Sequence, residues 1–193
     1  GSSDDKLVLN VNVKEKPTGS FSVGAGYSSV ESFIFTASIS KQNFLGYGIS
    51  TSVLAEVSKL RQQFSLSYSD PHFLDTNWIL NVTGYKLLTV YDDFNRDAFG
   101  GEVDLGHHLF DYSSLTVGYR VESVNVGNFS AIVPQFFKQD TSGLTSSIVM
   151  LGERDTRNNR LVATKGSYNN ASVEVAGVGG DNAFVRVNAN SRW

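Results

Sequence analysis

The stretch GSFSVGAGYSSVESFIFTASISKQ, residues 19–42, decides the fold. Its first half alternates Phe, Val, Ala and Tyr with Ser and Gly, and its second half alternates Phe, Ala and Ile with mainly Ser and Thr. Because a period of two is the signature of a β-strand, the stretch predicts a hairpin. Each run lasts about ten residues, the length at which a tilted strand crosses a bilayer. The first hypothesis is therefore a transmembrane β-sheet.

The same alternation continues to the end of the chain. Further strands are expected at residues 47–57, 62–69, 78–90, 99–108, 115–122, 144–151, 167–177 and 182–193, separated by polar or glycine-bearing turns. Residues 127–142 form the one long connection, and segment 144–151 carries apolar residues on both parities, so its facing is not assigned. The fold class predicted is all-β: an antiparallel transmembrane β-barrel of about ten strands with an up-and-down meander topology.

Composition excludes several classes of protein. The 193 residues contain no cysteine, which removes disulfides, thiolate metal sites and a cysteine nucleophile. A net charge of −3 gives no basic footprint for nucleic acid. No run of 18 apolar residues is present, so the sequence predicts no transmembrane helix.

The alternation leaves open which face is wet. In a membrane barrel the polar face lines a lumen, and Glu102, Asp104, Arg120 and Glu122 are placed to pair across it. Aromatic residues at strand ends on the apolar face fit an interfacial girdle: Tyr47, Tyr68, Trp78 and Trp193. The alternative is a soluble β-barrel that binds a small apolar ligand, with Phe21, Phe33, Phe35 and Trp78 in one cavity. A simple outer-membrane pore is a third possibility.

No catalytic constellation is found. His107 and His108 are adjacent in a strand and point to opposite faces, so they do not chelate one metal ion together. The glycine-rich runs are followed by no helix, which removes the phosphate-loop interpretation. The sequence predicts a protein that is not an enzyme, with no catalytic residues, no cofactor and no metal.

Four motifs, in order, resemble one family. Residues 11–27 resemble the junction between the last POTRA domain and the first barrel strand of the BamA-like outer-membrane barrel-assembly family. The turn NFLGYG at 43–48 is similar to that family's NLFG-G turn, and Asp70-Pro71 to its proline-bearing turn. DTRNN at 155–159 with ATKG at 163–166 resembles the segment before the ninth strand, with Val162-Ala163 where a proline is usual.

The departures predict the domain organisation. The family has several POTRA domains and a 16-stranded barrel, whereas this chain ends after the tenth expected strand. Residues 1–5 are interpreted as a tag remnant and disordered lead, 6–17 as the last strand of a POTRA domain or a linker, and 18–193 as a truncated barrel. The family's inward VRGF loop and closing strand are absent, so we expect no assembly activity from this chain alone.

The resemblance implies a function: assembly and insertion of unfolded outer-membrane proteins in the bacterial outer membrane. A glycine-containing first strand packs weakly, and its edge offers unpaired N–H and C=O groups that template a client strand. The expected functional edge consists of Ser20, Phe21, Ser22, Val23, Gly24, Ala25, Gly26 and Tyr27. These glycines equally fit relief of crowding where a barrel curves.

A sheet with free edges in lipid is costly, so the last strand is expected to pair with the first or with another copy of the chain. The closing residues are Val185, Val187, Ala189 and Trp193, which share one parity. The partners implied are therefore a lipid bilayer or detergent, and a second copy in a homodimer through the sheet edges.

Overall fold

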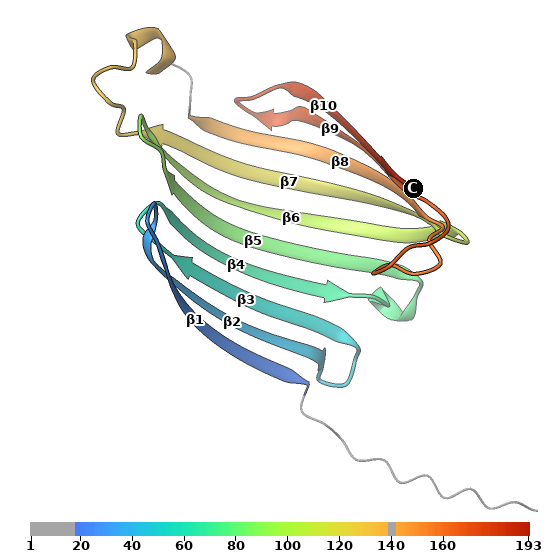
Figure 1. The fold of residues 1–193 in the computed structure, drawn as a ribbon. Coiled ribbons are helices and arrows are strands. Elements are labelled where there is room, and N and C mark those ends of the chain that lie inside the picture. Colours follow the sequence, from blue (N-terminus) through green and yellow to red (C-terminus); the bar gives the residue numbers. More distant parts are fainter. Residues whose placement is uncertain (1–17, 139–141) are drawn as a thin grey trace, which may run out of the picture.

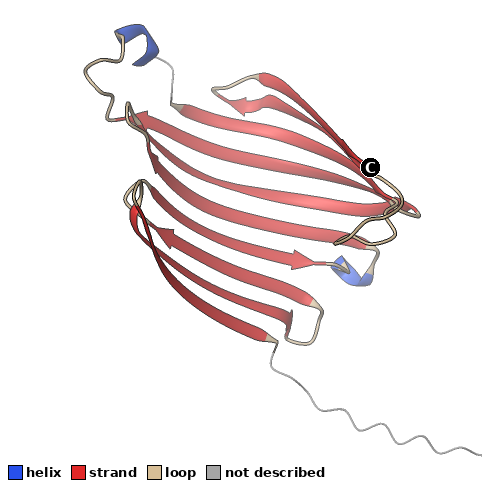
Figure 2. Ribbon diagram, viewed as in Figure 1, coloured by secondary structure: helices blue, strands red, loops and turns tan. Residues whose placement is uncertain are grey.

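The computed structural model describes residues 18–138 and 142–193. The expectations for residues 1–17 lie outside this described part. Ten strands form one antiparallel sheet in the order of the chain (Figures 1 and 2). They are β1 (Gly19–Ser28), β2 (Ser32–Phe44), β3 (Ile49–Val57), β4 (Arg61–Asp70), β5 (Trp78–Val90), β6 (Asn95–Phe110), β7 (Ser113–Gly127), β8 (Gly143–Asp155), β9 (Tyr168–Gly180) and β10 (Phe184–Arg192). The all-β meander of about ten strands is confirmed.

Two short 3-10 helices interrupt the connections: η1 (Phe73–Asp75) between β4 and β5, and η2 (Gln135–Lys138) between β7 and β8. Among the residues described, no helix is long and apolar enough to span a membrane.

The sheet has two unlike faces, set by register. Phe35 pairs with Ala25 on β1 and with Val57 on β3, so apolar side chains stand beside apolar ones from strand to strand. The same face carries Val103 of β6, which pairs with Val82 of β5 and Tyr119 of β7. We call this the apolar face. The opposite parity carries serine, threonine and charged residues and forms the polar face.

Curvature makes the polar face the concave one. Side chains on strands two apart meet across it: Tyr85 of β5 donates to Glu122 of β7 at 2.6 Å, and Arg120 of β7 lies 3.4 Å from Glu174 of β9. Such contacts over an intervening strand require a surface that bends toward them. Ser147, between the last two, is fully buried. The apolar face is therefore convex, and its side chains remain exposed.

The facing of β8, which the sequence leaves unassigned, follows from its neighbours. Ile148 and Met150 pair with Tyr119 and Val117 of β7, so they lie on the apolar face. Ser147 lies on the polar face beside Glu174. The strand also runs further than expected, to Asp155, because Asp155 pairs with Tyr168 of β9.

The arrangement of the sheet differs from the closed barrel that the sequence predicts, and it does not support the soluble alternative. The sheet is not closed: within the described residues, β1 pairs only with β2 and β10 only with β9. Ten strands with this gentle curvature form an open trough (Figure 1). A closed barrel requires a strand tilt and stagger that bring the first and last strands together. The aromatic cavity of the soluble alternative is also absent from this part of the chain, since Phe21 and Phe33 are 69% and 64% exposed on the convex face.

We call the end of the sheet where β1 begins the entry rim. A meander places the ends of β2, β4, β6, β8 and β10 there as well. Tyr47, Tyr68, Trp78 and Trp193 all lie at this rim or in its turns, the place of an interfacial girdle.

Candidate functional site

The polar face carries a connected set of charges, which we call the lumenal network. Arg120 holds Glu102 through two nitrogens at 2.9 and 3.0 Å, and its third nitrogen lies 3.4 Å from Glu174. Glu174 in turn accepts from Arg186 at 3.1 Å and from the Ser147 hydroxyl at 2.9 Å. The network thus ties β6, β7, β8, β9 and β10 together.

A second cluster is centred on Glu122. It accepts from Arg96 at 2.7 Å and from the Tyr85 hydroxyl at 2.6 Å. Tyr85 reaches Glu122 by lying across Gly100 of β6, where an added Cβ would stand 2.9 Å from its hydroxyl. Glycine is therefore needed at position 100 for this contact.

The four charges expected in the lumen all lie on the polar face, but they do not form one set of four. Glu102 and Arg120 pair directly. Glu122 pairs with Arg96 instead. Asp104 lies over Gly118, with its Oδ1 2.0 Å from the position of an added Cβ. The sequence analysis did not identify five residues of these clusters: Tyr85, Arg96, Ser147, Glu174 and Arg186. The available signal was the alternation within each strand, which places all five on the same face as Arg120.

The expected functional edge lies at the end of the sheet. All ten residues of β1 pair with β2, from Gly19 with Lys41 to Ser28 with Ser32. The other edge of β1 has no strand beside it in residues 18–138 and 142–193. Its apolar side chains are strongly exposed: Phe21 and Val23 are each 69% exposed and Tyr27 is 71% exposed.

The glycines of β1 are only partly explained by space. An added Cβ at Gly26 meets no atom within 4 Å, and at Gly24 it meets only the flexible Thr36 hydroxyl, at 2.7 Å. Crowding by the backbone therefore does not require glycine at either position. What the glycines do supply is a weak strand, because glycine lowers strand stability.

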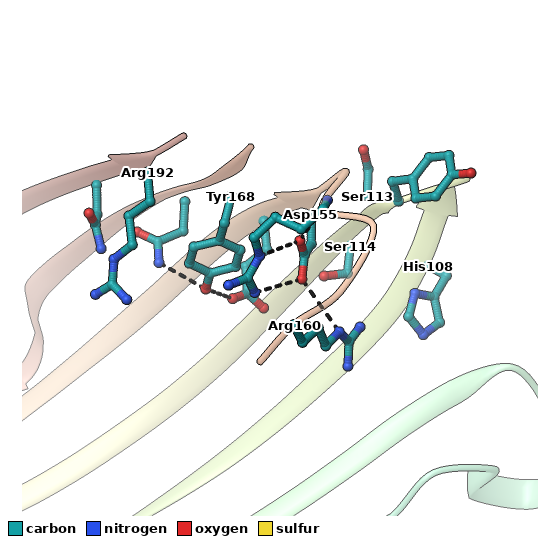
Figure 3. Close-up of a pocket in the computed structure, with 12 residues that line it drawn as sticks. His108, Ser113, Ser114, Asp155, Arg160, Tyr168 and Arg192 are labelled. Carbon is teal, nitrogen blue, oxygen red and sulfur yellow. Dashed lines mark hydrogen bonds and ion pairs between the residues drawn. The ribbon is translucent and has the colours of Figure 1, made fainter. Parts of the chain in front are cut away.

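The entry rim carries a third polar feature, a basin of about 720 Å³ that is bordered by the connection between β8 and β9 (Figure 3). Arg157 grips Asp155 with two nitrogens at 2.8 and 2.9 Å and lies 4.9 Å above the Tyr168 ring. The two bonds pair the Asp155 carboxylate with the Arg157 guanidinium.

Residues 43–193 match the Omp85 superfamily domain. The chain belongs to the Omp85 superfamily. It is 27% identical over 186 residues to outer membrane protein assembly factor BamA of Nitratidesulfovibrio vulgaris, covering 95% of this chain and 24% of that protein. It is 23% identical over 208 residues to BamA of Neisseria meningitidis, covering 98% and 26%. It thus spans about a quarter of the length of these relatives.

A solved structure agrees. The crystal structure of BamA from Haemophilus ducreyi lacking POTRA domains 1–3 superposes with a TM-score of 0.74 at 22% identity, covering 92% of this chain and 37% of that one. A SAM50-like protein of Schizosaccharomyces pombe is 24% identical over 211 residues, covering 96% of this chain and 40% of that protein. The open trough of this Omp85 chain therefore has the fold of part of a larger barrel wall.

In this Omp85 sheet, Glu174 is the residue on which the lumenal network depends most. Its side chain is only 9% exposed, and its removal leaves the buried Ser147 hydroxyl without an acceptor. We expect Glu174→Ala to lower the free energy of unfolding by about 1–3 kcal/mol, the usual range for such groups. Urea titration of the chain in detergent micelles measures it.

Ser172→Ala is the matched control, because Ser172 also faces the lumen from β9 but accepts only a 3.4 Å bond from Asn188 in an exposed position. Its expected cost is within about 0.5 kcal/mol. Equal midpoints for the two variants would contradict a stabilising role for Glu174.

Proposed function

We propose that this chain is barrel wall of an outer-membrane protein assembly factor, located in the bacterial outer membrane, and that the open edge of β1 receives client strands. The family membership and the names of the two BamA relatives support the assembly role. The observation that carries the mechanism is the edge itself: β1 is paired along its whole length on one side, and on its other side no strand of residues 18–138 and 142–193 lies beside it.

The chemistry of the edge suits this role. A free strand edge presents a row of backbone N–H and C=O groups, which in lipid have no water to satisfy them. An unfolded outer-membrane protein has the complementary groups and alternating side chains, so it pairs by β-augmentation. Gly24 and Gly26 keep the existing strand weak enough to exchange partners.

Cysteine crosslinking tests the proposal, and the chain has no cysteine of its own to interfere. The chain carrying Ser22→Cys is reconstituted in liposomes and mixed with a urea-unfolded outer-membrane protein that has one cysteine in its last strand. We expect a disulfide, because paired strands bring Cα atoms within the roughly 4.4–6.8 Å that a disulfide needs.

The control is Ser38→Cys on β2, which pairs with Ser22 and shares its face but has a strand on both sides. It should form no crosslink, since the client strand would lie one strand further away. Equal crosslinking at the two positions, or none at Ser22→Cys, would refute templating and leave a simple pore as the better description.

The same edges bear on the state of the purified chain. Because the described part of the chain places no strand beside the outer edges of β1 and β10, a second copy can cover β10 with its own β1 in micelles without a client. We propose this homodimer as the resting state of the isolated chain. Light scattering on the detergent complex gives the number of copies, and a single copy would count against it.

A further inference from the structure

The rim basin is a polar hollow that belongs neither to the lumenal network nor to the open edge of β1. Arg192 and His108 stand on opposite sides of it, with Arg160 between them (Figure 3). Its volume, about 720 Å³, lies within the range of roughly 300–1,000 Å³ typical of ligand sites. It therefore has room for a short stretch of polypeptide.

The basin has a net positive charge, and part of this charge is not neutralised by its own carboxylates. Three guanidinium groups, those of Arg157, Arg160 and Arg192, face two carboxylates, Asp155 and Glu153. Arg157 is fully engaged by Asp155, whereas Arg160 reaches it only at 3.4 Å and is 84% exposed. Arg192 pairs with Tyr168 through its backbone, but its side chain forms no hydrogen bond or ion pair with any residue that the structure describes. Two guanidinium groups are thus available to an incoming anion.

Internal hydrogen bonds fix the conformation of the β8–β9 connection, which contributes Arg157 and Arg160 to the basin. The Asn158 side chain accepts from the backbone of Thr164 and Lys165 at 3.1 Å each, and Asn159 accepts from Leu161 at 2.8 Å. Gly166 has a φ of +92°, where an added Cβ would stand 2.1 Å from the Thr156 carbonyl oxygen. The connection between β8 and β9 is therefore preorganised.

This rigid connection presents an apolar tip. Leu161 and Val162 are among the most exposed large hydrophobic side chains of the described chain. They stand next in sequence to Arg160, so an apolar contact and a cationic contact are offered side by side. A partner that matches both has a carboxylate close to apolar side chains.

The position of the basin selects a polypeptide over a lipid. Glu153, Tyr168 and Arg192 share the parity of the lumenal network, so they line the concave face and not the face that meets lipid. Arginine pairs with carboxylates through two parallel bonds, as Arg157 already does with Asp155.

We propose that the rim basin binds an extended polypeptide segment that carries a carboxylate, with Arg160 and Arg192 as its ligands and the Leu161–Val162 tip against the neighbouring apolar side chains. The carboxylate is supplied by a chain terminus or by an acidic side chain. The site is separate from the edge of β1 and does not depend on templating.

Fluorescence anisotropy on the full chain in detergent micelles tests this. Three labelled octapeptides of one alternating apolar sequence are compared: one with a free terminal carboxylate, one amidated, and one amidated with an internal glutamate. We expect the amidated peptide to bind about tenfold or more weakly than the first, since a hydrogen bond to a charged group is worth about 1.5–3 kcal/mol. The glutamate peptide shows whether a side chain serves equally.

Arg160→Gln with Arg192→Gln should weaken the carboxylate peptide to the level of the amidated one. Arg154→Gln is the matched control, because Arg154 lies at the same rim on β8 but on the apolar parity, and it should change nothing. The double variant Leu161→Ser, Val162→Ser should weaken the binding of the peptides but leave the binding of acetate unchanged. Far-UV circular dichroism verifies that each variant is folded.

Unchanged binding by the double arginine variant, or equal binding of the carboxylate and amidated peptides, would overturn the proposal. So would displacement of the peptide by inorganic phosphate at concentrations where acetate has no effect, because the basin would then be a phosphate site. Loss of templating at Ser22→Cys leaves these outcomes unaffected, so the two proposals fail separately.

Discussion

In detergent micelles the chain should give a strong β spectrum by far-UV circular dichroism, and in plain buffer it should not fold. Within the described residues the only buried hydrophobic side chains are Ala98 and Ala176. A water-soluble sheet would need a covered apolar layer, because burial of apolar surface is the dominant favourable term in folding. Here the convex face has no covering layer, and Phe99 is 67% exposed on it.

The control is the same detergent below its critical micelle concentration, which separates the effect of an apolar phase from that of detergent monomers. Folding that appears only above this concentration supports lipid as the partner of the convex face. An equally folded β-protein in plain buffer would contradict it.

The architecture was predictable because its signal is local. Alternation at residues 19–42 indicates that the stretch forms strands, which residues share a face, and how long the strands are. The turns are marked by residue types typical of turns, as at Asn43 to Gly48. The same signal failed at β8, where Val149 and Met150 are both apolar. Only the pairing of β8 with β7 shows which of its residues lie on which face, and this pairing belongs to the tertiary structure.

The functional features were predictable only in part for the same reason. Glu102 and Arg120 lie directly opposite each other on neighbouring strands, so their pairing follows from register. Glu174 meets Arg120 across an intervening strand, which depends on curvature that no local pattern encodes. The rim basin brings residues of the β8–β9 connection together with Arg192 at the end of β10. This arrangement, like the open form of the sheet, depends on curvature, which no local sequence pattern encodes.

The cost of a charge on β4 should depend on which face receives it. Leu66 and Ser67 are adjacent near the middle of the strand, and register places them on opposite faces: Leu66 pairs with Val53 and Gly84, Ser67 with Ser52 and Thr83. Leu66 is 58% exposed on the apolar face, whereas Ser67 lines a shallow polar hollow with Ser52 and Ser69. The two positions therefore form a matched pair at one depth.

We expect Leu66→Arg to lower the free energy of unfolding in liposomes by about 2–4 kcal/mol, the cost of arginine facing lipid near the bilayer midplane. Ser67→Arg should cost less than about 1 kcal/mol, because its guanidinium lies in the wet trough beside hydroxyl groups. Urea titration of the two reconstituted variants measures the difference. A larger cost at Ser67 would mean that the faces are reversed, and equal costs would mean that neither face meets lipid.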